Sequence, residues 1–199
     1  MIKTAIILVC LIILISCTPK PIKDYGSDCF HPADEEKLRL FVDSTKNFQM
    51  LIPDHWLMTK PYGNYIFAMI DTIGFKKDSI RRMLTLEAFQ LPPEQSFEEY
   101  LVNLQINTSQ AIKNAGETDI FKITSIEDFK WNNKDIQRSI TVDTSNPMVT
   151  TTTSQVHINN DGIVFVITIG TQGADIEQLN CKYSDCIKSL KWIVSLKNQ

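Results

Sequence analysis

The chain has 199 residues, of which 43% are hydrophobic and 22% are charged, and its formal net charge is −3 with histidine neutral. This hydrophobic content is ordinary for a globular domain, and the sequence has no internal repeat or heptad array. A weakly acidic chain without a basic stripe is a poor candidate for binding nucleic acid.

The first seventeen residues have the pattern of a secretory signal peptide. Lys3 precedes an apolar run, Ala5 to Ile15, which is too short to cross a bilayer because a spanning helix needs roughly twenty apolar residues. The end of this run together with the two residues after it, Leu14-Ile15-Ser16-Cys17, resembles the lipobox of bacterial lipoproteins. The resemblance implies that residues 1–16 are removed and that Cys17 is lipidated and becomes the mature N-terminus. The alternative is an uncleaved N-terminal membrane helix.

Residues 17–28 are interpreted as a tether between the membrane and the domain. They are polar and contain Pro19 and Pro21, so they suit neither a regular helix nor a central strand. One acyl chain anchors a protein only marginally. The lipoprotein resemblance implies a diacylglyceryl group with an added N-acyl chain, such as palmitate, on Cys17. We expect attachment to the cell membrane or the outer membrane, facing the periplasm or the exterior; Thr18, in place of Asp, favours the outer membrane.

Three thiols remain in the expected mature domain, residues 29–199: Cys29, Cys181 and Cys186. An odd number in an oxidising compartment leaves at least one unbridged thiol. On an ideal helix Cys181 and Cys186 are about 140° apart, so they are not expected to pair with each other. Cys29 joined to Cys181 or to Cys186 is a candidate disulfide, and three unpaired thiols are the alternative. No metal site is expected, because only His31 lies near these cysteines.

The first part of the domain is predicted to form strands. A hairpin is expected from 41–43 and 47–53, where Phe48, Met50 and Ile52 alternate with other residues and Pro53 ends the strand. Asp54-His55-Trp56 is then a turn. Two further strands are expected at 65–70 and 82–91.

A long helix is predicted over residues 96–115. Ser96 and Glu99 have the spacing of a capping box, and Gly116 is a typical helix end. Apolar residues then recur at helical spacing. The positions are Phe97, Tyr100, Leu101, Leu104, Thr108, Ala111, Ile112 and Ala115.

The pattern then returns to strands and ends in a second helix. Segments rich in Ile, Val and Thr predict strands. These are residues 120–126, 136–143, 149–158 and 163–169, with a tight turn at 159–162. Apolar residues at three-four spacing predict a final helix over 175–193, with a break near Asn180 left open. Because strands and helices do not alternate, we expect an α+β fold with one largely antiparallel sheet and helices packed on it.

Two segments resemble the PsbP-like superfamily. Asn47-Phe48-Gln49-Met50-Leu51-Ile52-Pro53-Asp54-His55-Trp56 is similar to the opening of that group, and Ile187-Lys188-Ser189-Leu190-Lys191-Trp192 is similar to its closing helix. The resemblance covers residues 41–193 and implies an α-β-α sandwich. It implies no catalytic residues.

The remaining polar residues do not form a recognisable catalytic, cofactor or metal site. His31, His55 and His157 are not spaced as metal ligands, and Cys29 with His31 is a poor dyad because the two are so close in sequence. His157 is expected to face solvent or to satisfy one partner. The basic segment 76–82 is expected to be a loop between strands, with contact to anionic lipid or a partner as the alternative.

The sequence therefore favours a membrane-anchored, non-enzymatic binding or assembly module of the bacterial envelope. Its expected partners are the membrane, through the lipid on Cys17, and an envelope protein. The alternatives are an envelope enzyme of hydrolase type, with a site assembled from distant residues, and a purely structural envelope component. A deep pocket that gathers His55 or His157 with carboxylates would favour the enzyme.

Overall fold

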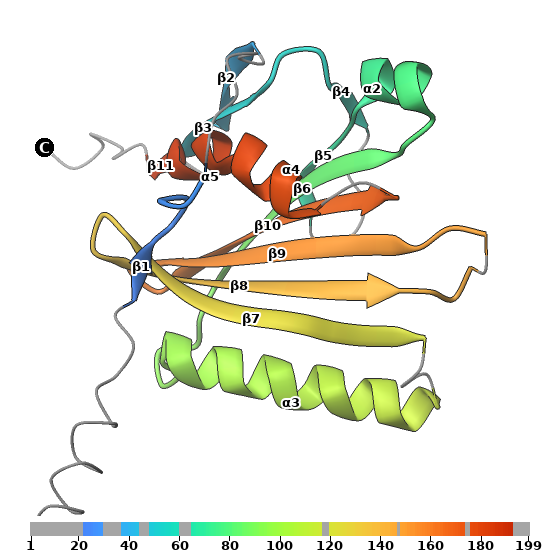
Figure 1. Ribbon diagram of the computed structural model, residues 1–199. Helices are drawn as coiled ribbons and strands as arrows, with labels where there is room; N and C mark the ends of the chain where they lie inside the picture. The colour runs from blue at the N-terminus through green and yellow to red at the C-terminus, as the bar shows by residue number, and fades with distance from the viewer. Residues whose placement is uncertain are drawn as a thin grey trace, which may run out of the picture.

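The computed structural model describes residues 22–29, 37–43, 48–59, 65–116, 120–146, 148–173 and 176–192. These residues form two sheets and the helices packed on them (Figure 1). The expected signal peptide (residues 1–16), Cys17 and His31 lie outside the described residues. No described helix is long and apolar enough to pass through a lipid bilayer.

The main sheet has eight strands in the order β1-β7-β8-β9-β10-β6-β5-β4. All neighbouring strands are antiparallel except β1 and β7, which are parallel. The strands are β1 (Lys23–Asp24), β4 (Leu57–Thr59), β5 (Tyr65–Ile70), β6 (Arg82–Gln90), β7 (Phe121–Trp131), β8 (Lys134–Asp143), β9 (Thr151–Asn160) and β10 (Ile163–Gln172). The predicted α+β fold with a largely antiparallel sheet is confirmed.

A second, three-stranded sheet has the order β11-β3-β2, so the prediction of a single sheet was incomplete. It contains β2 (Leu38–Asp43), β3 (Phe48–Pro53) and β11 (Lys191–Trp192). The pairing of β2 with β3 confirms the predicted hairpin. β11 adds to the other edge of β3.

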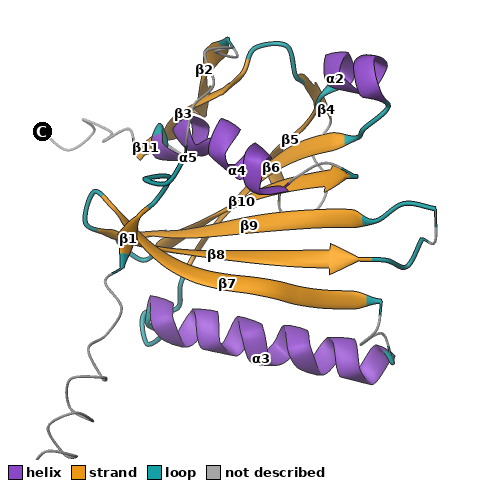
Figure 2. Cartoon of the chain, in the orientation of Figure 1, coloured by secondary structure: helices purple, strands orange, loops and turns teal. Residues whose placement is uncertain are grey.

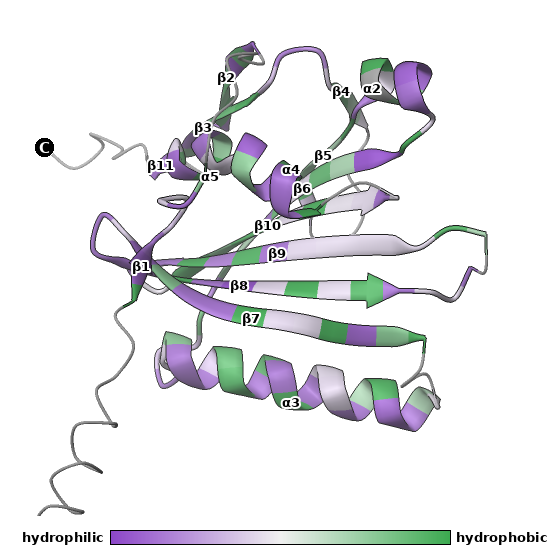
Figure 3. Ribbon diagram, viewed as in Figure 1, coloured by the Kyte–Doolittle hydropathy of each residue, from purple (hydrophilic) through white to green (hydrophobic). Residues whose placement is uncertain are grey.

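Helices cover both faces of the main sheet. α3 (Phe97–Ala115) lies on one face, while α4 (Ile176–Lys182), α5 (Ser184–Lys188) and the small sheet lie on the other (Figures 1 and 2). α3 begins at the predicted capping box and ends at Gly116, whose φ of 71° is in the left-handed region that glycine favours. Hydrophilic and hydrophobic bands alternate along α3 (Figure 3), as expected for a helix with one face on a sheet.

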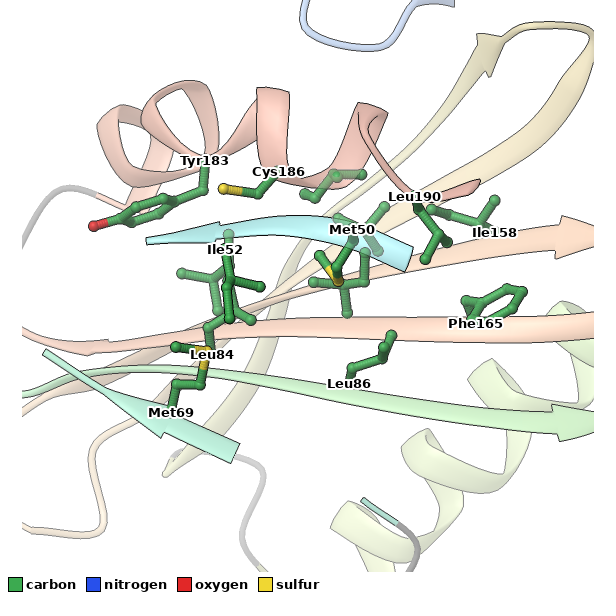
Figure 4. Close-up of a cluster of buried hydrophobic side chains, with 14 of the residues drawn as sticks. Met50, Ile52, Met69, Leu84, Leu86, Ile158, Phe165, Tyr183, Cys186 and Leu190 are labelled. Atoms are coloured by element: carbon green, nitrogen blue, oxygen red, sulfur yellow. The ribbon is translucent and has the colours of Figure 1, made fainter. Parts of the chain in front are cut away.

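The main core lies between the main sheet and the layer of β3, α4 and α5. Figure 4 shows Met50 and Ile52 of β3 between the helix that carries Cys186 and the sheet residues Leu84 and Leu86, all of them buried. The ring of Trp56 packs edge-on against Tyr183, with 5.2 Å between centroids. The alternating pattern of β3 therefore places its buried residues in this core.

The predicted final helix over 175–193 is interrupted at Tyr183 and ends early, at Lys188, so the prediction is wrong for its last residues. The chain leaves helical geometry at Tyr183 (φ −101°, ψ 10°), three residues after the position considered for a break, and α5 ends at Lys188. Ser189 Oγ donates to the Cys186 carbonyl oxygen and accepts from Leu51 N–H, both at 2.6 Å. Pairing with β3 thus overrides the helical periodicity of the last residues.

The basic segment 76–82 is not simply a loop. α2 (Thr72–Asp78) includes its first half, and Ser79 leaves the helix with a φ of 61°. Arg82 begins β6 and forms an ion pair with Asp78 at 2.5 Å. That hydrogen bond lowers the pKa of Asp78 and raises the pKa of Arg82.

Residues 23–28, expected in the tether, are instead part of the folded domain. β1 pairs with Phe129 and Lys130 of β7, and Tyr25 is buried in the main core.

Candidate functional site

A cavity of about 640 Å³ lies where the N-terminal segment crosses the edge of the main sheet. Three parts of the fold form its walls: β1 with the turn after it, the strands β7 and β8, and the helices α4 and α5. The lining residues are 22–29, 126–129, Arg138, Glu177, Asn180, Cys181 and Ser184.

The N-terminal wall is held by backbone pairing and by close packing. Tyr25 N–H donates to the Lys130 carbonyl oxygen at 2.8 Å, and the Tyr25 ring meets Phe129 edge-on at 5.4 Å. Gly26 has a φ of 72°, and a Cβ there would lie 3.0 Å from Lys188 Nζ and 3.2 Å from Ser184 Cβ. Only glycine suits this position, because it allows both the backbone angle and the close approach to α5.

A disulfide between Cys29 and Cys181 links this wall to α4. The two residues are 152 positions apart in sequence and their Cα atoms are 5.1 Å apart, within the usual range for a bridge. This is one of the two pairings considered from the sequence. Cys186 keeps its thiol and is buried in the main core.

Arg138 of β8 spans the cavity wall and is the most heavily paired charge there. Its Nη1 donates to Glu177 Oε2 of α4 at 2.9 Å, and its Nη2 donates to the carboxylate of Glu127 on β7. The guanidinium also lies 5.3 Å from the centroid of the Phe129 ring. Since the side chain is only 12% exposed, Arg138 is a fixed link between the sheet and α4.

Three buried polar side chains line the cavity without satisfying their hydrogen-bonding groups. Asn180 is 2% exposed, Ser184 is fully buried and Tyr25 is 4% exposed. The Asn180 amide atoms, Ser184 Oγ and Tyr25 Oη have no hydrogen-bond partner among the described residues. Each such group costs about 1–3 kcal/mol unless something pairs with it. The arrangement is therefore suited to a polar guest.

The charges around the cavity are mostly negative. Five carboxylates line it, Asp24, Asp28, Glu127, Asp128 and Glu177, against two lining cations, Lys23 and Arg138, and Lys188 Nζ lies close behind Gly26 of the N-terminal wall. Both lining cations are already paired: Lys23 Nζ lies 2.5 Å from Asp28 Oδ2, and Arg138 contacts Glu127 and Glu177. Burial raises the pKa of Tyr25, so its hydroxyl stays neutral at physiological pH.

His157 lies away from this cavity, beneath α3. It is 3% exposed, and the Tyr100 hydroxyl is 3.2 Å from its Nδ1, so it has one partner and does not face solvent. Burial lowers the pKa of His157 to about 4 and raises the pKa of Tyr100 to about 12. A buried neutral histidine of this kind has the character of a packing residue.

His55 forms a separate polar cluster, near α2. Its Nε2 lies 3.5 Å from Oδ1 of the buried Asp71, whose Oδ2 lies 3.5 Å from Arg82 Nη1. This is a histidine paired with a carboxylate, but it does not line the cavity behind β1. The deep pocket around a histidine that would favour an enzyme is therefore not formed at this cavity.

A second hollow, of about 570 Å³, follows the start of α3 and is lined mainly by exposed side chains. Across the described part of the chain, no group of three or more His, Cys, Asp or Glu side chains is placed to hold a metal ion. The cavity behind β1 is thus the better candidate site.

Sequence reasoning found one part of this site, the cysteine pair, and missed the rest. Arg138, Asn180 and Ser184 occupy ordinary strand and helix positions, and nothing in their spacing indicates that they meet. The available signal was a pair of polar residues on the apolar face of the final helical segment: Asn180 follows Ile176 by four residues, and Ser184 follows Asn180 by four.

Comparison with known proteins shows similarity at the level of structure only. No protein-family model matches the chain, and no curated protein sequence is similar to it. The structure resembles PsbP (CyanoP) of Synechocystis with a TM-score of 0.55 at 12% identity, over 83% of this chain and 98% of that one. It also resembles the Ran-binding protein Mog1p of Saccharomyces cerevisiae with a TM-score of 0.53 at 7% identity, over 79% and 96% of the two chains. The chain therefore has a PsbP-like and Mog1-like α+β fold.

Proposed function

We propose that this chain is a lipid-anchored, non-enzymatic binding module of the bacterial cell envelope, with its ligand site in the cavity behind β1. The observation that carries the proposal is the set of buried, unsatisfied polar groups of Asn180, Ser184 and Tyr25 around one cavity. Proteins retain such groups at a cost in stability, and binding sites are where that cost is commonly found.

The proposed anchor would place this cavity close to a membrane. Cys17 precedes Ile22, which lines the cavity, by five residues, so the two Cα atoms are at most about 18 Å apart. α2 lies at the far end of the molecule from β1 (Figure 1), so it would point away from the bilayer. The site would then be at the membrane-facing end of the domain.

A binding role is favoured over the two alternatives by the nature of the cavity. His55 and His157 were the two histidines whose presence in a deep pocket would favour a hydrolase, and neither lines the cavity. A purely structural component has no use for unsatisfied polar groups around a hollow. One structural neighbour, Mog1p, is named as a Ran-binding protein, which is compatible with this fold serving as a binding module.

The proposal is tested by native mass spectrometry of the full-length chain, expressed with its own N-terminal segment and purified from membranes in detergent. We expect a mature protein that begins at an acylated Cys17 and carries a bound small molecule. Ser27→Trp, on the exposed rim of the cavity, should abolish the bound species, while Ser145→Trp, on an exposed turn outside the cavity, should retain it.

Three results would overturn the proposal. An unmodified N-terminus would remove the anchor. An adduct that survives Ser27→Trp would remove the cavity as the site. A bound molecule that is chemically converted on incubation would favour the enzyme.

A further inference from the structure

We propose that the cavity behind β1 binds a small ligand through a primary ammonium group. This inference rests on the proposed function, because it assumes that the cavity is the binding site. It adds the chemical class of the ligand. This class follows from the charged lining residues, here called the rim, and from the buried polar groups of Asn180, Ser184 and Tyr25, here called the floor.

The rim favours a positive charge. Its five carboxylates outnumber its two cations, and each of those cations already contacts a carboxylate. A ligand carboxylate or phosphate would find both Nη atoms of Arg138 already bound to Glu177 and Glu127, with only the buried Nε without a partner among the described residues, and it would add a further negative charge to the rim. A cationic ligand would instead be attracted to the rim, because Asp24 and Asp128 lie there and their charges are not neutralised by Lys23 or Arg138.

The floor suits a donor with several N–H groups. Asn180 Oδ1, Ser184 Oγ and Tyr25 Oη are all acceptors, and none has a hydrogen-bond partner among the described residues. A primary ammonium carries three N–H donors on one atom, as the lysine side chain does. The Asn180 Nδ2 donor and the two hydroxyls can also pair with a neighbouring hydroxyl of the ligand. A divalent metal fits less well, because the described residues offer no cluster of three metal-type ligands.

Two sources of this chemistry exist at an envelope: a free amine, such as an amino sugar, and the ethanolamine head group of a phospholipid. Isothermal titration of the full-length chain in detergent separates them. The soluble probes are glucosamine, glucose and glucuronate, which share a ring and differ in charge. The lipid probes are short-chain phosphatidylethanolamine and phosphatidylcholine, which differ in whether the ammonium has N–H donors.

We expect either glucosamine to bind at least about tenfold more tightly than glucose, or phosphatidylethanolamine to bind at least about tenfold more tightly than phosphatidylcholine. Glucuronate should be the weakest ligand. Asp24→Asn removes one rim charge without touching Arg138, and it should weaken amine binding several-fold. Glu98→Gln, which removes the same charge from the exposed surface of α3, should leave the affinity unchanged. Raising the salt concentration should weaken binding by the wild type.

The outcomes separate this inference from the proposed function. Glucose or glucuronate binding as tightly as glucosamine, with loss in Ser27→Trp, overturns the ammonium class and leaves the cavity as a binding site. Equal affinity of wild type and Asp24→Asn for the amine also overturns it. If every amine probe fails while native mass spectrometry shows a cavity-bound molecule, the ligand class alone is wrong; if no molecule is bound in either experiment, both proposals fail.

Discussion

His157 is a buried titratable side chain whose proton equilibrium is shifted by folding. Burial lowers its pKa from 6.5 to about 4, so between these values the unfolded chain binds the proton and the folded chain does not. Stability therefore rises with pH across this window and is fully present above pH 6.5. As the pH falls towards 4, the protein loses up to about 3 kcal/mol from this residue alone.

The measurement is chemical denaturation at pH 7.0 and pH 4.5 for the wild type and for His157→Gln, which keeps a polar side chain but does not titrate. Carboxylates contribute to the acid sensitivity of both proteins, so the difference between them isolates the histidine. We expect the variant to lose less stability between the two pH values. Equal losses in the two proteins would show that His157 is not held neutral by burial.

Asn180 is the residue where stability and the proposed function oppose each other. Its amide atoms are buried and have no partner among the described residues. Asn180→Leu, a substitution of similar size, removes the unpaired groups and should raise the free energy of unfolding of the ligand-free protein by about 1–2 kcal/mol. It should also abolish ligand binding.

The measurement combines thermal unfolding with titration of the bound amine. Ser109→Ala, on the exposed face of α3, is the control and should change neither quantity. A loss of stability in Asn180→Leu would contradict the assignment, because it would mean that the amide is already satisfied inside the fold.

At the scale of elements, the disulfide is a covalent link between the first and last described segments of the domain. It joins the segment after β1 to α4 across 152 residues of sequence. Cross-linking so large a loop restricts the unfolded chain, so Cys29→Ser/Cys181→Ser should lower the free energy of unfolding by roughly 2–5 kcal/mol. Because both cysteines also line the cavity, the same variant should bind its ligand less tightly.

Mass spectrometry of the unreduced and reduced mature protein checks the bridge itself. Reduction should add the mass of two hydrogens, and a proteolytic digest should contain one linked pair of peptides, with Cys29 and Cys181. Detection of three reactive thiols in the unreduced protein would contradict the pairing and would favour the alternative of three unpaired cysteines.

Local sequence signals predicted those elements whose stability is local. α3 was predicted because Ser96, Glu99 and Gly116 mark its ends and its apolar residues repeat at helical spacing. The hairpin turn at 159–162 was predicted for the same reason, and Asp161 and Gly162 have the positive φ angles that such a turn requires. In these cases neighbouring residues are enough to decide the structure.

Elements that depend on distant partners were missed. β1 and β11 have two residues each and exist because they pair with β7 and β3, respectively. The end of α5 depends on Ser189, which contacts Leu51 across a separation of 138 residues. A local pattern cannot report contacts of this kind, so the final helix was predicted to extend to residue 193, with only a break near Asn180 left open.

At the scale of the whole molecule, the candidate site is made where three such long-range contacts converge. The parallel pairing of β1, the bridge from Cys29 to Cys181 and the ion pairs of Arg138 together bring residues 22–29 against β7, β8 and α4. The fold class followed from the order of strands and helices. The cavity did not, because its lining residues come from three separate parts of the chain.

The same geometry connects the cavity to the proposed anchor. The segment that would emerge from the membrane at Cys17 enters the domain at the wall of the cavity, on the opposite side from α2 (Figure 1). A ligand held there would be close to the bilayer surface.

The most direct test of a ligand site in the cavity behind β1 is a map of amide chemical-shift changes by NMR while the isotopically labelled full-length chain, in detergent micelles, is titrated with glucosamine. If the ligand binds in this cavity, the changes gather in residues 22–29, 126–129 and 177–184 and leave α2 unaffected. Changes that gather at α2, along α3 or around His55, with none in residues 22–29, would contradict this site.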